Sequence, residues 1–259
     1  MVASPRRAYF VCATPRSGST LLCRSLAETG VAGRPEEFFE RLRHSGLPRE
    51  PREYFPPDAD PELLALLPGT RMGDPAAAEL ARELPRYLAE GTTPNGVFGA
   101  KLMWGYFGDL LARLEAGRDD GRGALHAAFG GEPAFVHVSR RDKVAQAVSL
   151  WRAVQTRAWS ADDDANGVTP VYDARGIGLL RDQLIAQDAA WEAWFAGQGV
   201  APLRIDYETF ASDYAASIRR VLEHLGLGAA DIPPPPTRRQ GDARSDRWVG
   251  RFNDEKELG

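Results

Sequence analysis

Four short apolar runs alternate along the chain with longer segments of helical spacing. The run at residues 8–13 is nearly continuous in hydrophobicity, as is typical of a strand buried on both faces of a sheet, and residues 96–102, 134–139 and 202–207 are the further strand candidates. Helical spacing predicts helices within residues 20–29, 61–91, 105–116, 142–157, 177–198 and 211–225. This alternation predicts an α/β fold: a single domain of residues 1–259, with a central parallel sheet and helices on both faces.

Two segments break this alternation. Residues 33–60 match neither period and are rich in proline, so we expect a loop there with a short helical piece at Glu36–Leu42. Pro233–Pro236 predicts a stiff extended segment that leads into a polar tail.

Composition narrows the class of protein. With 43% hydrophobic and 26% charged residues the chain is typical of globular proteins, and its net charge of -4 gives no basic excess for binding nucleic acid. No apolar run is long enough for a signal-peptide core or approaches the ~20 residues of a membrane span. We therefore expect a cytoplasmic protein. Cys12 and Cys23 are too few for a disulfide framework or a zinc cage, and their apolar context predicts buried free thiols.

The segment Thr14–Thr20 connects the first predicted strand to the first predicted helix. It consists of small and polar residues around Arg16. A helix N-terminus has unsatisfied amides and partial positive charge, so such a loop can bind a phosphate group. An ordinary capped turn has a similar composition. The loop alone leaves both interpretations open.

A loop for nucleoside triphosphates, as in a nucleotide kinase, is the main alternative. That pattern requires a glycine five residues before Gly18 and a lysine directly after it, whereas this chain has Ala13 and Ser19. Phosphoryl transfer also needs a magnesium-binding carboxylate. A sulfuryl group carries less negative charge and can be transferred without a metal. The missing lysine therefore favours sulfuryl transfer.

Two further segments can bind anionic groups. One arginine of the pair Arg140-Arg141, at the end of the third strand, can converge on a phosphate with Ser149 of the next helix. Near the C-terminus, a basic segment contains Arg239, Gln240 and Arg244. Taken alone, each segment is also explained as a solvated surface.

Several longer motifs resemble a known family. They are R-S-G-S-T-L-L at 16–22, E-F-F at 37–39, T-P-N-G-V at 93–97, K-L-M-W at 101–104, Q-A-V-S-L-W-R-A-V-Q-T at 146–156 and R-S-D-R-W-V at 244–249. They span nearly the whole chain, which thereby resembles the bacterial trehalose 2-sulfotransferase family of the sulfotransferase superfamily. The resemblance implies transfer of a sulfuryl group from 3′-phosphoadenosine 5′-phosphosulfate to a sugar hydroxyl, on trehalose or a related sugar, and a homodimer.

The resemblance also implies roles for individual residues. The phosphosulfate loop would bind the donor through Arg16, Ser17, Gly18, Ser19 and Thr20. The rest of the donor site would be formed by Arg140, Ser149, Arg239, Gln240 and Arg244. Glu37 would be the general base, with Glu36 as its rival. The acceptor site would include Arg34, Pro35, Glu36, Glu37, Phe38, Phe39 and Trp104.

The chemistry of sulfuryl transfer adds further candidates. An attacking hydroxyl needs a base to take its proton, and Arg16 with the loop amides would stabilise charge on the leaving oxygen. Lys101, at the end of the second strand, is a candidate catalytic cation or a lysine that simply extends to solvent. Trp104 can stack on a sugar or belong to the core. His137 is interpreted as a packed core histidine, and is the next candidate for the base.

The chain departs from the family pattern near the expected acceptor site. Arg34 and Glu36 stand where the family has an acidic residue and a glutamine, and Gly105 replaces an asparagine. The acceptor is therefore left open between trehalose, another sugar and a different small alcohol. A carbohydrate- or nucleotide-binding protein without catalysis is the alternative from another class.

Overall fold

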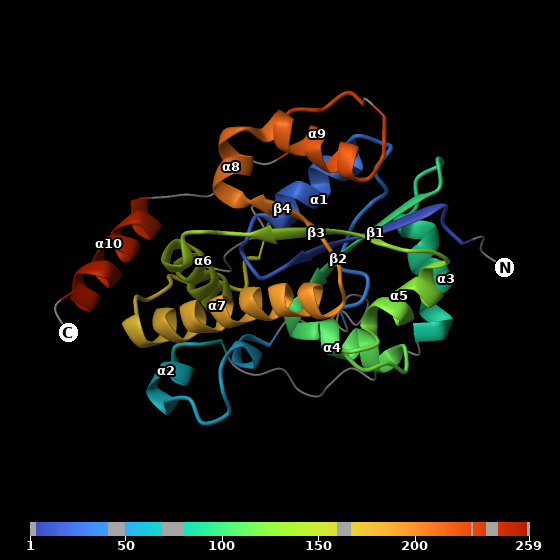
Figure 1. Ribbon diagram of the computed structural model, residues 1–259. Helices are drawn as coiled ribbons and strands as arrows, with labels where there is room; N and C mark the ends of the chain where they lie inside the picture. Colours follow the sequence, from blue (N-terminus) through green and yellow to red (C-terminus); the bar gives the residue numbers. More distant parts are fainter. Residues whose placement is uncertain are drawn as a thin grey trace. The chain divides into compact units, whose positions relative to one another are not determined.

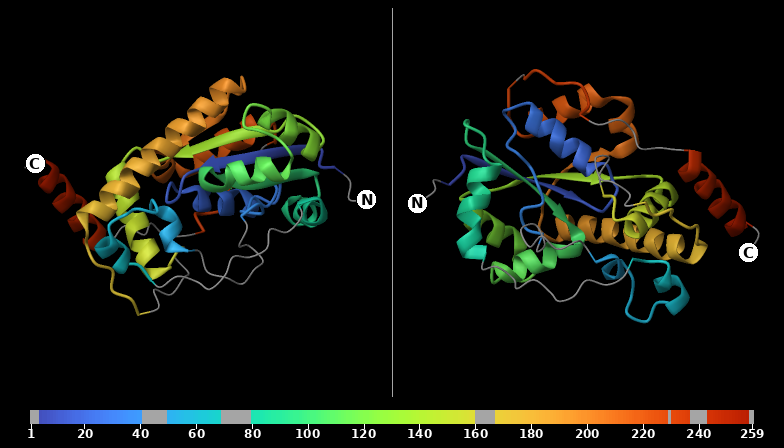
Figure 2. Two further views of the ribbon diagram at one scale, coloured as in Figure 1. Left: turned by 90° about the horizontal axis from the view of Figure 1, so that it is seen from below. Right: turned by 180° about the vertical axis from the view of Figure 1, so that it is seen from behind.

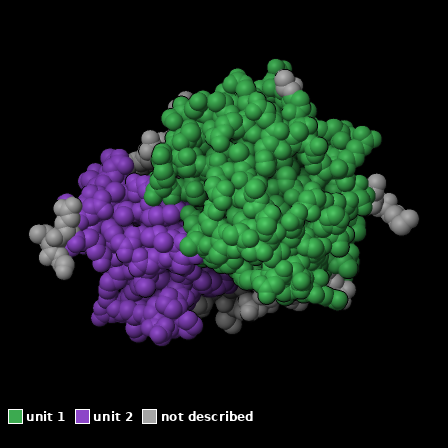
Figure 3. Space-filling model, viewed as in Figure 1, with its two compact units in different colours: residues 1–43, 76–141, 187–236 green, residues 44–75, 142–186, 237–259 purple. Residues whose placement is uncertain are grey.

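The computed structural model describes residues 4–40, 50–68, 80–159, 167–228, 230–236 and 243–257. The chain divides into two compact units (Figure 3). The first comprises residues 1–43, 76–141 and 187–236, and the second residues 44–75, 142–186 and 237–259. The expectation of one domain over residues 1–259 stays a prediction.

The first unit is built on a four-stranded parallel sheet in the order β2-β1-β3-β4 (Figure 1). The strands are β1 (Arg7–Ala13), β2 (Val97–Met103), β3 (Ala134–Ser139) and β4 (Leu203–Asp206). All four predicted strands are thereby confirmed. Ala13, the last residue of β1, pairs with Met103 and Val138, so these strands end together at the edge where parallel sheets bind ligands.

Helices cover both faces of this sheet (Figures 1 and 2). Successive strand residues point to opposite faces, so Val11 and Phe10 belong to different cores. The core that contains Val11 is completed by α1 (Ser19–Glu28), α8 (Tyr207–Ser212) and α9 (Tyr214–His224). The core that contains Phe10 is completed by α3 (Leu80–Gly91), α4 (Trp104–Arg113), α5 (Gly121–Phe129) and the last turns of α7 (Ala174–Gly197). The predicted α/β class is confirmed.

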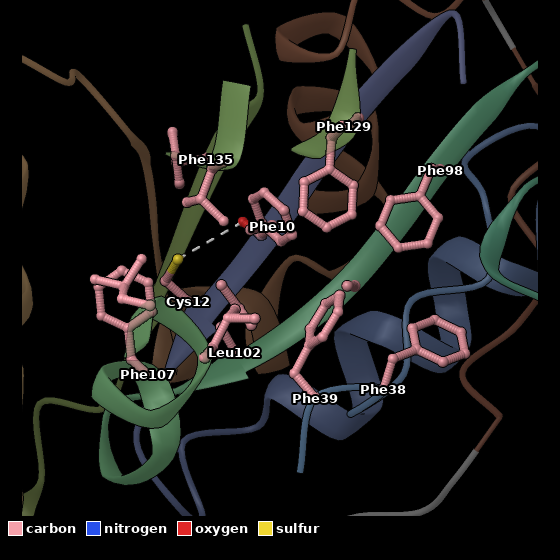
Figure 4. Packing of buried hydrophobic residues seen from close by; sticks show 14 of the residues in the cluster. Phe10, Cys12, Phe38, Phe39, Phe98, Leu102, Phe107, Phe129 and Phe135 are labelled. Atoms are coloured by element: carbon pink, nitrogen blue, oxygen red, sulfur yellow. Dashed lines mark hydrogen bonds between the residues drawn. The ribbon is translucent and has the colours of Figure 1, made fainter. Parts of the chain in front are cut away.

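The core under α4 and α5 consists largely of aromatic rings (Figure 4). The ring centroid of Phe129 lies 5.0 Å from that of Phe10 and 5.3 Å from that of Phe98, at separations where aromatic pairs attract. Phe38 and Phe39 join this core and are almost completely buried. Burial of each ring contributes about 1.5–3 kcal/mol, so the chain that follows Glu37 is firmly anchored.

The second unit is helical in the part that the structure describes. It contains the 3₁₀ helix η1 (Pro51–Tyr54), α2 (Pro61–Ala65), α6 (Lys143–Thr156), the first turns of α7, and α10 (Ala243–Glu257). The expected polar tail is wrong for residues 243–257, which form α10. Trp248, Val249 and Phe252 recur at helical spacing and pack with α6 residues in one core, in which Phe252 is buried.

Three other expectations about local structure are corrected. The segment predicted as one helix at 211–225 forms α8 and α9, separated at Asp213. The helical piece expected at 36–42 is absent over the described residues 36–40, because the main chain of Glu36 instead forms a β-bridge with Ala100. Helix α5 has no counterpart among the predicted helices, since Gly121 and Gly123 weaken its helical pattern.

Candidate active site

The loop between β1 and α1 has an unusual backbone. Arg16 and Gly18 both take left-handed conformations, with φ of 63° and 88°. At Arg16 this conformation costs about 1–2 kcal/mol. A Cβ atom at position 18 would lie 2.4 Å from Cδ2 of Tyr207, so only glycine fits there. Helix α1 begins at Ser19, with neither a side-chain cap from the described residues nor an acidic residue in its first turn. Its N-terminus is therefore suited to an anion.

Two unsatisfied polar atoms lie in this region. Ser17 is fully buried, and among the described residues its Oγ has no hydrogen-bond partner. The buried Nε of Arg140 also lacks one within that part of the chain, with Oε1 of Glu208 4.0 Å away. Tyr207 connects the two places, because its ring lies against Gly18 and 4.9 Å from the guanidinium carbon of Arg140. Since buried polar atoms normally have partners, these atoms fit a ligand with anionic groups.

Lys101 of β2 contacts both the segment of the predicted base and the first turn of α1. Nζ of Lys101 lies 2.8 Å from Oε1 of Glu37 and 3.0 Å from Oγ1 of Thr20. The side chains of Lys101 and Glu37 are only 7% and 15% exposed. Three residues from separate sequence motifs thus form one cluster, at the end of the sheet where β1 and β2 stop.

The two adjacent glutamates have different surroundings. The main-chain carbonyl of Glu36 accepts a hydrogen bond of 2.8 Å from the amide of Lys101, and the residue as a whole is exposed. Glu37 turns its carboxylate to the ammonium of Lys101. The main chain two residues after Glu37 is held by Arg113, whose Nη1 donates a 3.3 Å hydrogen bond to the carbonyl of Phe39. The structure therefore places the Glu37 carboxylate beside the loop helix.

Tyr106 is a member of this cluster that sequence reasoning missed. Its hydroxyl donates a hydrogen bond of 3.0 Å to the main-chain carbonyl of Lys101 and lies 3.5 Å from Oε2 of Glu37. The tyrosine reaches the carboxylate because α4 begins directly after β2 and leads Tyr106 back to the strand end. Its place two residues after the K-L-M-W motif was the only signal in the sequence.

Comparison with known proteins assigns this chain to a family. A family model described as Stf0 sulphotransferase matches residues 8–255. The chain belongs to the Stf0 sulphotransferase family. A trehalose 2-sulfotransferase of Mycobacterium tuberculosis is 41% identical over 254 residues, which cover 96% of this chain and 95% of that protein. One of Mycolicibacterium smegmatis is 40% identical over 250 residues, which cover 95% and 94%.

Membership of the Stf0 family confirms the predicted sulfotransferase and shows that the nucleotide-kinase alternative is wrong. A solved sulfotransferase structure from Alicyclobacillus acidocaldarius aligns over 98% of this chain and 95% of its own with 13% identity and a TM-score of 0.46. A likeness of that size adds nothing to the assignment.

In the second predicted donor segment of this Stf0 sulphotransferase, the two arginines differ in exposure and in their partners. The Arg140 side chain is 16% exposed, whereas that of Arg141 is 68% exposed and pairs with Asp206 at 3.3 Å. Arg140 is thus the better placed of the two for a ligand. Ser149 lies on α6 in the other unit, so its convergence with Arg140 stays a prediction.

The C-terminal donor segment is described only in part. Arg239 and Gln240 lie outside the described residues. Arg244 is in the first turn of α10, next to Ser245, whose Oγ accepts a 2.6 Å hydrogen bond from Nη1 of Arg152 on α6. This contact anchors the start of α10 within its unit. The donor role of the segment stays a prediction.

The remaining acceptor residues have mixed surroundings. Arg34 is exposed, and Pro35 is buried beside it. Trp104 begins α4, and the guanidinium carbon of Arg118 lies 4.2 Å from its ring centroid. Its edge contact with Trp191, at a centroid separation of 5.1 Å, joins it to the core. A sugar could stack on the face that Arg118 covers only after the arginine moves.

His137 is buried, as its strand position predicts. Its Nδ1 lies 2.9 Å from Oε1 of Glu192. Burial lowers the pKa of His137 below its ordinary value, although the charges of Asp188 and Glu192 oppose this shift. The predicted burial of the two thiols is confirmed as well, and burial raises the pKa of Cys23 to about 12.

Two kinds of feature are absent from the described residues. No group of three or more His, Cys, Asp or Glu side chains is arranged there to hold a metal ion. Within the same ranges, no helix combines the length and apolar character needed to cross a membrane.

Proposed function

We propose that this chain transfers a sulfuryl group from 3′-phosphoadenosine 5′-phosphosulfate to a hydroxyl of trehalose, with Glu37 as the general base. The donor is the one that the family implies, and the acceptor is taken from the names of the two mycobacterial relatives. The observation that carries the proposal is the cluster of Glu37, Lys101 and Thr20, since it sets a carboxylate beside the helix that would hold the donor.

The donor side of the proposal uses the loop and its unsatisfied groups. The amides at the start of α1, with Arg16 and the Ser17 hydroxyl, would bind the 5′-phosphosulfate. Arg140 would bind the 3′-phosphate through its Nε, which has no hydrogen-bond partner among the described residues, together with Ser149. The C-terminal segment that includes Arg239, Gln240 and Arg244 would complete the site.

The reaction follows from these positions. Glu37 takes the proton of the acceptor hydroxyl as its oxygen attacks the sulfur atom, forming a new S–O bond. The bond from sulfur to the 5′-phosphate oxygen breaks, and its electron pair stays on adenosine 3′,5′-bisphosphate. Arg16 and the loop amides stabilise the charge that develops on this oxygen. Lys101 holds Oε1 of Glu37, and this contact orients the carboxylate that would receive the proton.

The acceptor site would lie around residues 34–39 and 104–106. Phe38 and Phe39 are buried, whereas Arg34 and Glu36 are exposed and could contact a sugar whose hydroxyl lies at Glu37. These are positions where the chain departs from the family pattern. Another sugar or a small alcohol is therefore the alternative to trehalose.

A transfer assay with labelled sulfate tests the proposal. Labelled donor is incubated with the protein and with trehalose, other disaccharides, monosaccharides and small alcohols, and labelled products are separated. Transfer to trehalose above all other acceptors is expected. Preferred transfer to another acceptor would overturn the choice of trehalose while preserving the reaction. No transfer to any of them, with the donor product still bound, would indicate a binding protein.

A thermal-shift measurement tests the donor independently. Adenosine 3′,5′-bisphosphate is expected to raise the melting temperature, because a ligand that binds only the native state stabilises it. ATP with magnesium is expected to raise it much less, and an equal or larger shift would contradict the donor assignment. The expected homodimer and cytoplasmic location stay predictions, and light scattering of the purified protein tests the first.

A further inference from the structure

Helix α7 contacts the junction between β1 and the phosphate loop at two consecutive residues. Nε1 of Trp191 donates a buried hydrogen bond of 3.0 Å to the carbonyl of Ala13, the last residue of β1. Oγ1 of Thr14, the next residue, donates a 3.0 Å hydrogen bond to Oδ1 of Asp188. Asp188 and Trp191 are three positions apart, so they lie on the same side of the helix.

This junction immediately precedes the strained part of the loop. Ala13 and Thr14 are completely buried, and Arg16 follows two residues later with its left-handed backbone. A backbone in a rare conformation persists only when its surroundings hold it there. The described contacts of α7 hold the chain where it enters that conformation.

We propose that Asp188 and Trp191 are positioning residues for sulfuryl transfer, and we call this pair the α7 clamp. They act through Ala13 and Thr14 and keep Arg16 and the loop amides aligned with the charge that forms as the sulfuryl group departs. The proposal rests on the proposed donor site in the loop.

The charge of Asp188 indicates which step the clamp serves. A carboxylate near a loop that binds an anion repels that anion, so it does not improve donor affinity. A hydroxyl that donates to a carboxylate, however, forms a stronger hydrogen bond than one that donates to a neutral group. The α7 clamp therefore fixes the geometry of the loop but does not increase its affinity for the donor. Its loss is expected to lower turnover without weakening donor binding.

Four single substitutions test this inference in the full chain. Thr14→Val removes the hydroxyl at nearly constant volume, and Thr14→Ser retains it. Asp188→Asn keeps an oxygen that can accept the hydrogen bond but removes the charge. Glu192→Gln is the matched control, because Glu192 lies one turn further along α7 and contacts His137 and Arg204. For each variant, kcat, both KM values, the Kd of adenosine 3′,5′-bisphosphate and the melting temperature are measured.

The expected pattern separates positioning from stability and from binding. Thr14→Val is expected to lower kcat by roughly 10–100-fold, since small displacements of catalytic groups have effects of this order. The Kd of the bisphosphate should stay within about threefold or become tighter, since the repulsion from Asp188 is not increased. Asp188→Asn should lower kcat less than Thr14→Val does, and it should decrease the Kd of the bisphosphate. Thr14→Ser and Glu192→Gln should keep kcat within about twofold, because both leave the contact of the loop with Asp188 in place.

Three results would overturn the inference. The first is a melting temperature that falls in Thr14→Val while kcat per folded molecule is unchanged. The second is a parallel loss of bisphosphate affinity and kcat, and the third an equal loss of kcat in Glu192→Gln. If Thr14→Val does not fold, the Asp188→Asn variant tests the inference. Unchanged kcat and bisphosphate Kd in that variant would exclude a role for the Asp188 charge in positioning the loop. A wild-type protein that fails to bind the bisphosphate would refute the donor site instead.

Discussion

The two sides of the candidate site are held in place by different means. The donor loop, Thr14–Thr20, depends on its backbone, with left-handed residues at Arg16 and Gly18 and a helix N-terminus behind them. The segment of the base depends on side chains, with Phe38 and Phe39 buried in the aromatic core and Glu37 paired to Lys101. Lys101 connects the two sides, since it also contacts Thr20.

This difference determines how each side tolerates substitution. A site formed by a particular backbone conformation loses its geometry when a substituted residue cannot adopt that conformation, even if the new side chain is small. A site held by side chains tolerates changes of shape poorly where those side chains are buried in the core. Its chemistry, however, can be removed by one conservative substitution of the reactive group. We therefore expect the base segment to be sensitive to charge and the loop to be sensitive to steric bulk.

The largest effect is expected for Glu37→Gln. This substitution keeps the shape of the side chain and removes the proton acceptor, so single-turnover transfer at saturating donor should fall by about 10²–10⁴-fold. The Kd of adenosine 3′,5′-bisphosphate should hardly change. Glu36→Gln is the control and should be far milder. If Glu36→Gln is the inactive variant, the base has been assigned one residue too late, and if neither matters, His137 is the next candidate.

Arg16→Ala should have the next largest effect. Loss of one group that stabilises developing charge typically lowers turnover by about 10²–10³-fold, and Arg16 is the charged residue within the loop. Turnover should fall more than the affinity for adenosine 3′,5′-bisphosphate, as measured by kinetics and by calorimetry. Collapse of donor affinity with normal turnover at saturation would make Arg16 a binding residue only.

Gly18→Ala tests the steric sensitivity of the loop. The new Cβ would meet Tyr207 at 2.4 Å in addition to the left-handed strain, so bisphosphate affinity should fall and stability should decrease by about 1–3 kcal/mol. Gly30→Ala is a matched control, because Gly30 also has a positive φ, of 70°, and its added Cβ meets no described atom within 4 Å. Equal losses of stability in both variants, with bisphosphate binding intact, would show that the contact with Tyr207 is unimportant.

The smallest effect is expected for Tyr106→Phe. It removes a hydroxyl that lies 3.5 Å from Glu37 and leaves the ring in place, so kcat should fall by only a few fold, the range of a single neutral hydrogen bond. Addition of Glu37→Gln to this variant tests the coupling. If Tyr106 acts through Glu37, the double variant should be no slower than Glu37→Gln alone. Additive losses would mean that the tyrosine acts elsewhere.

Much of the fold could be predicted because it depends on local patterns. The four strands were recognisable as short segments rich in apolar residues, and a glycine-containing loop between a strand and a helix indicated an anion site. Helix α10 was missed because its apolar stripe, Trp248, Val249 and Phe252, is short and stands among charged residues. The two anion segments at Ser149 and Arg239 remain predictions, since their position relative to the loop is a matter of tertiary arrangement.

The sequence by itself determined the succession of strands and helices along the chain, the position of the loop, the glutamate pair and the family. These are local properties, because they depend on motifs and hydrophobic periods. Only the tertiary structure decided which polar groups meet. Lys101 and Glu37 are 64 positions apart, and their contact depends on β2 ending beside the segment after α1. The contact of Thr14 with Asp188 spans 174 positions. Such pairings follow from how strands and helices pack, and no spacing in the sequence encodes them.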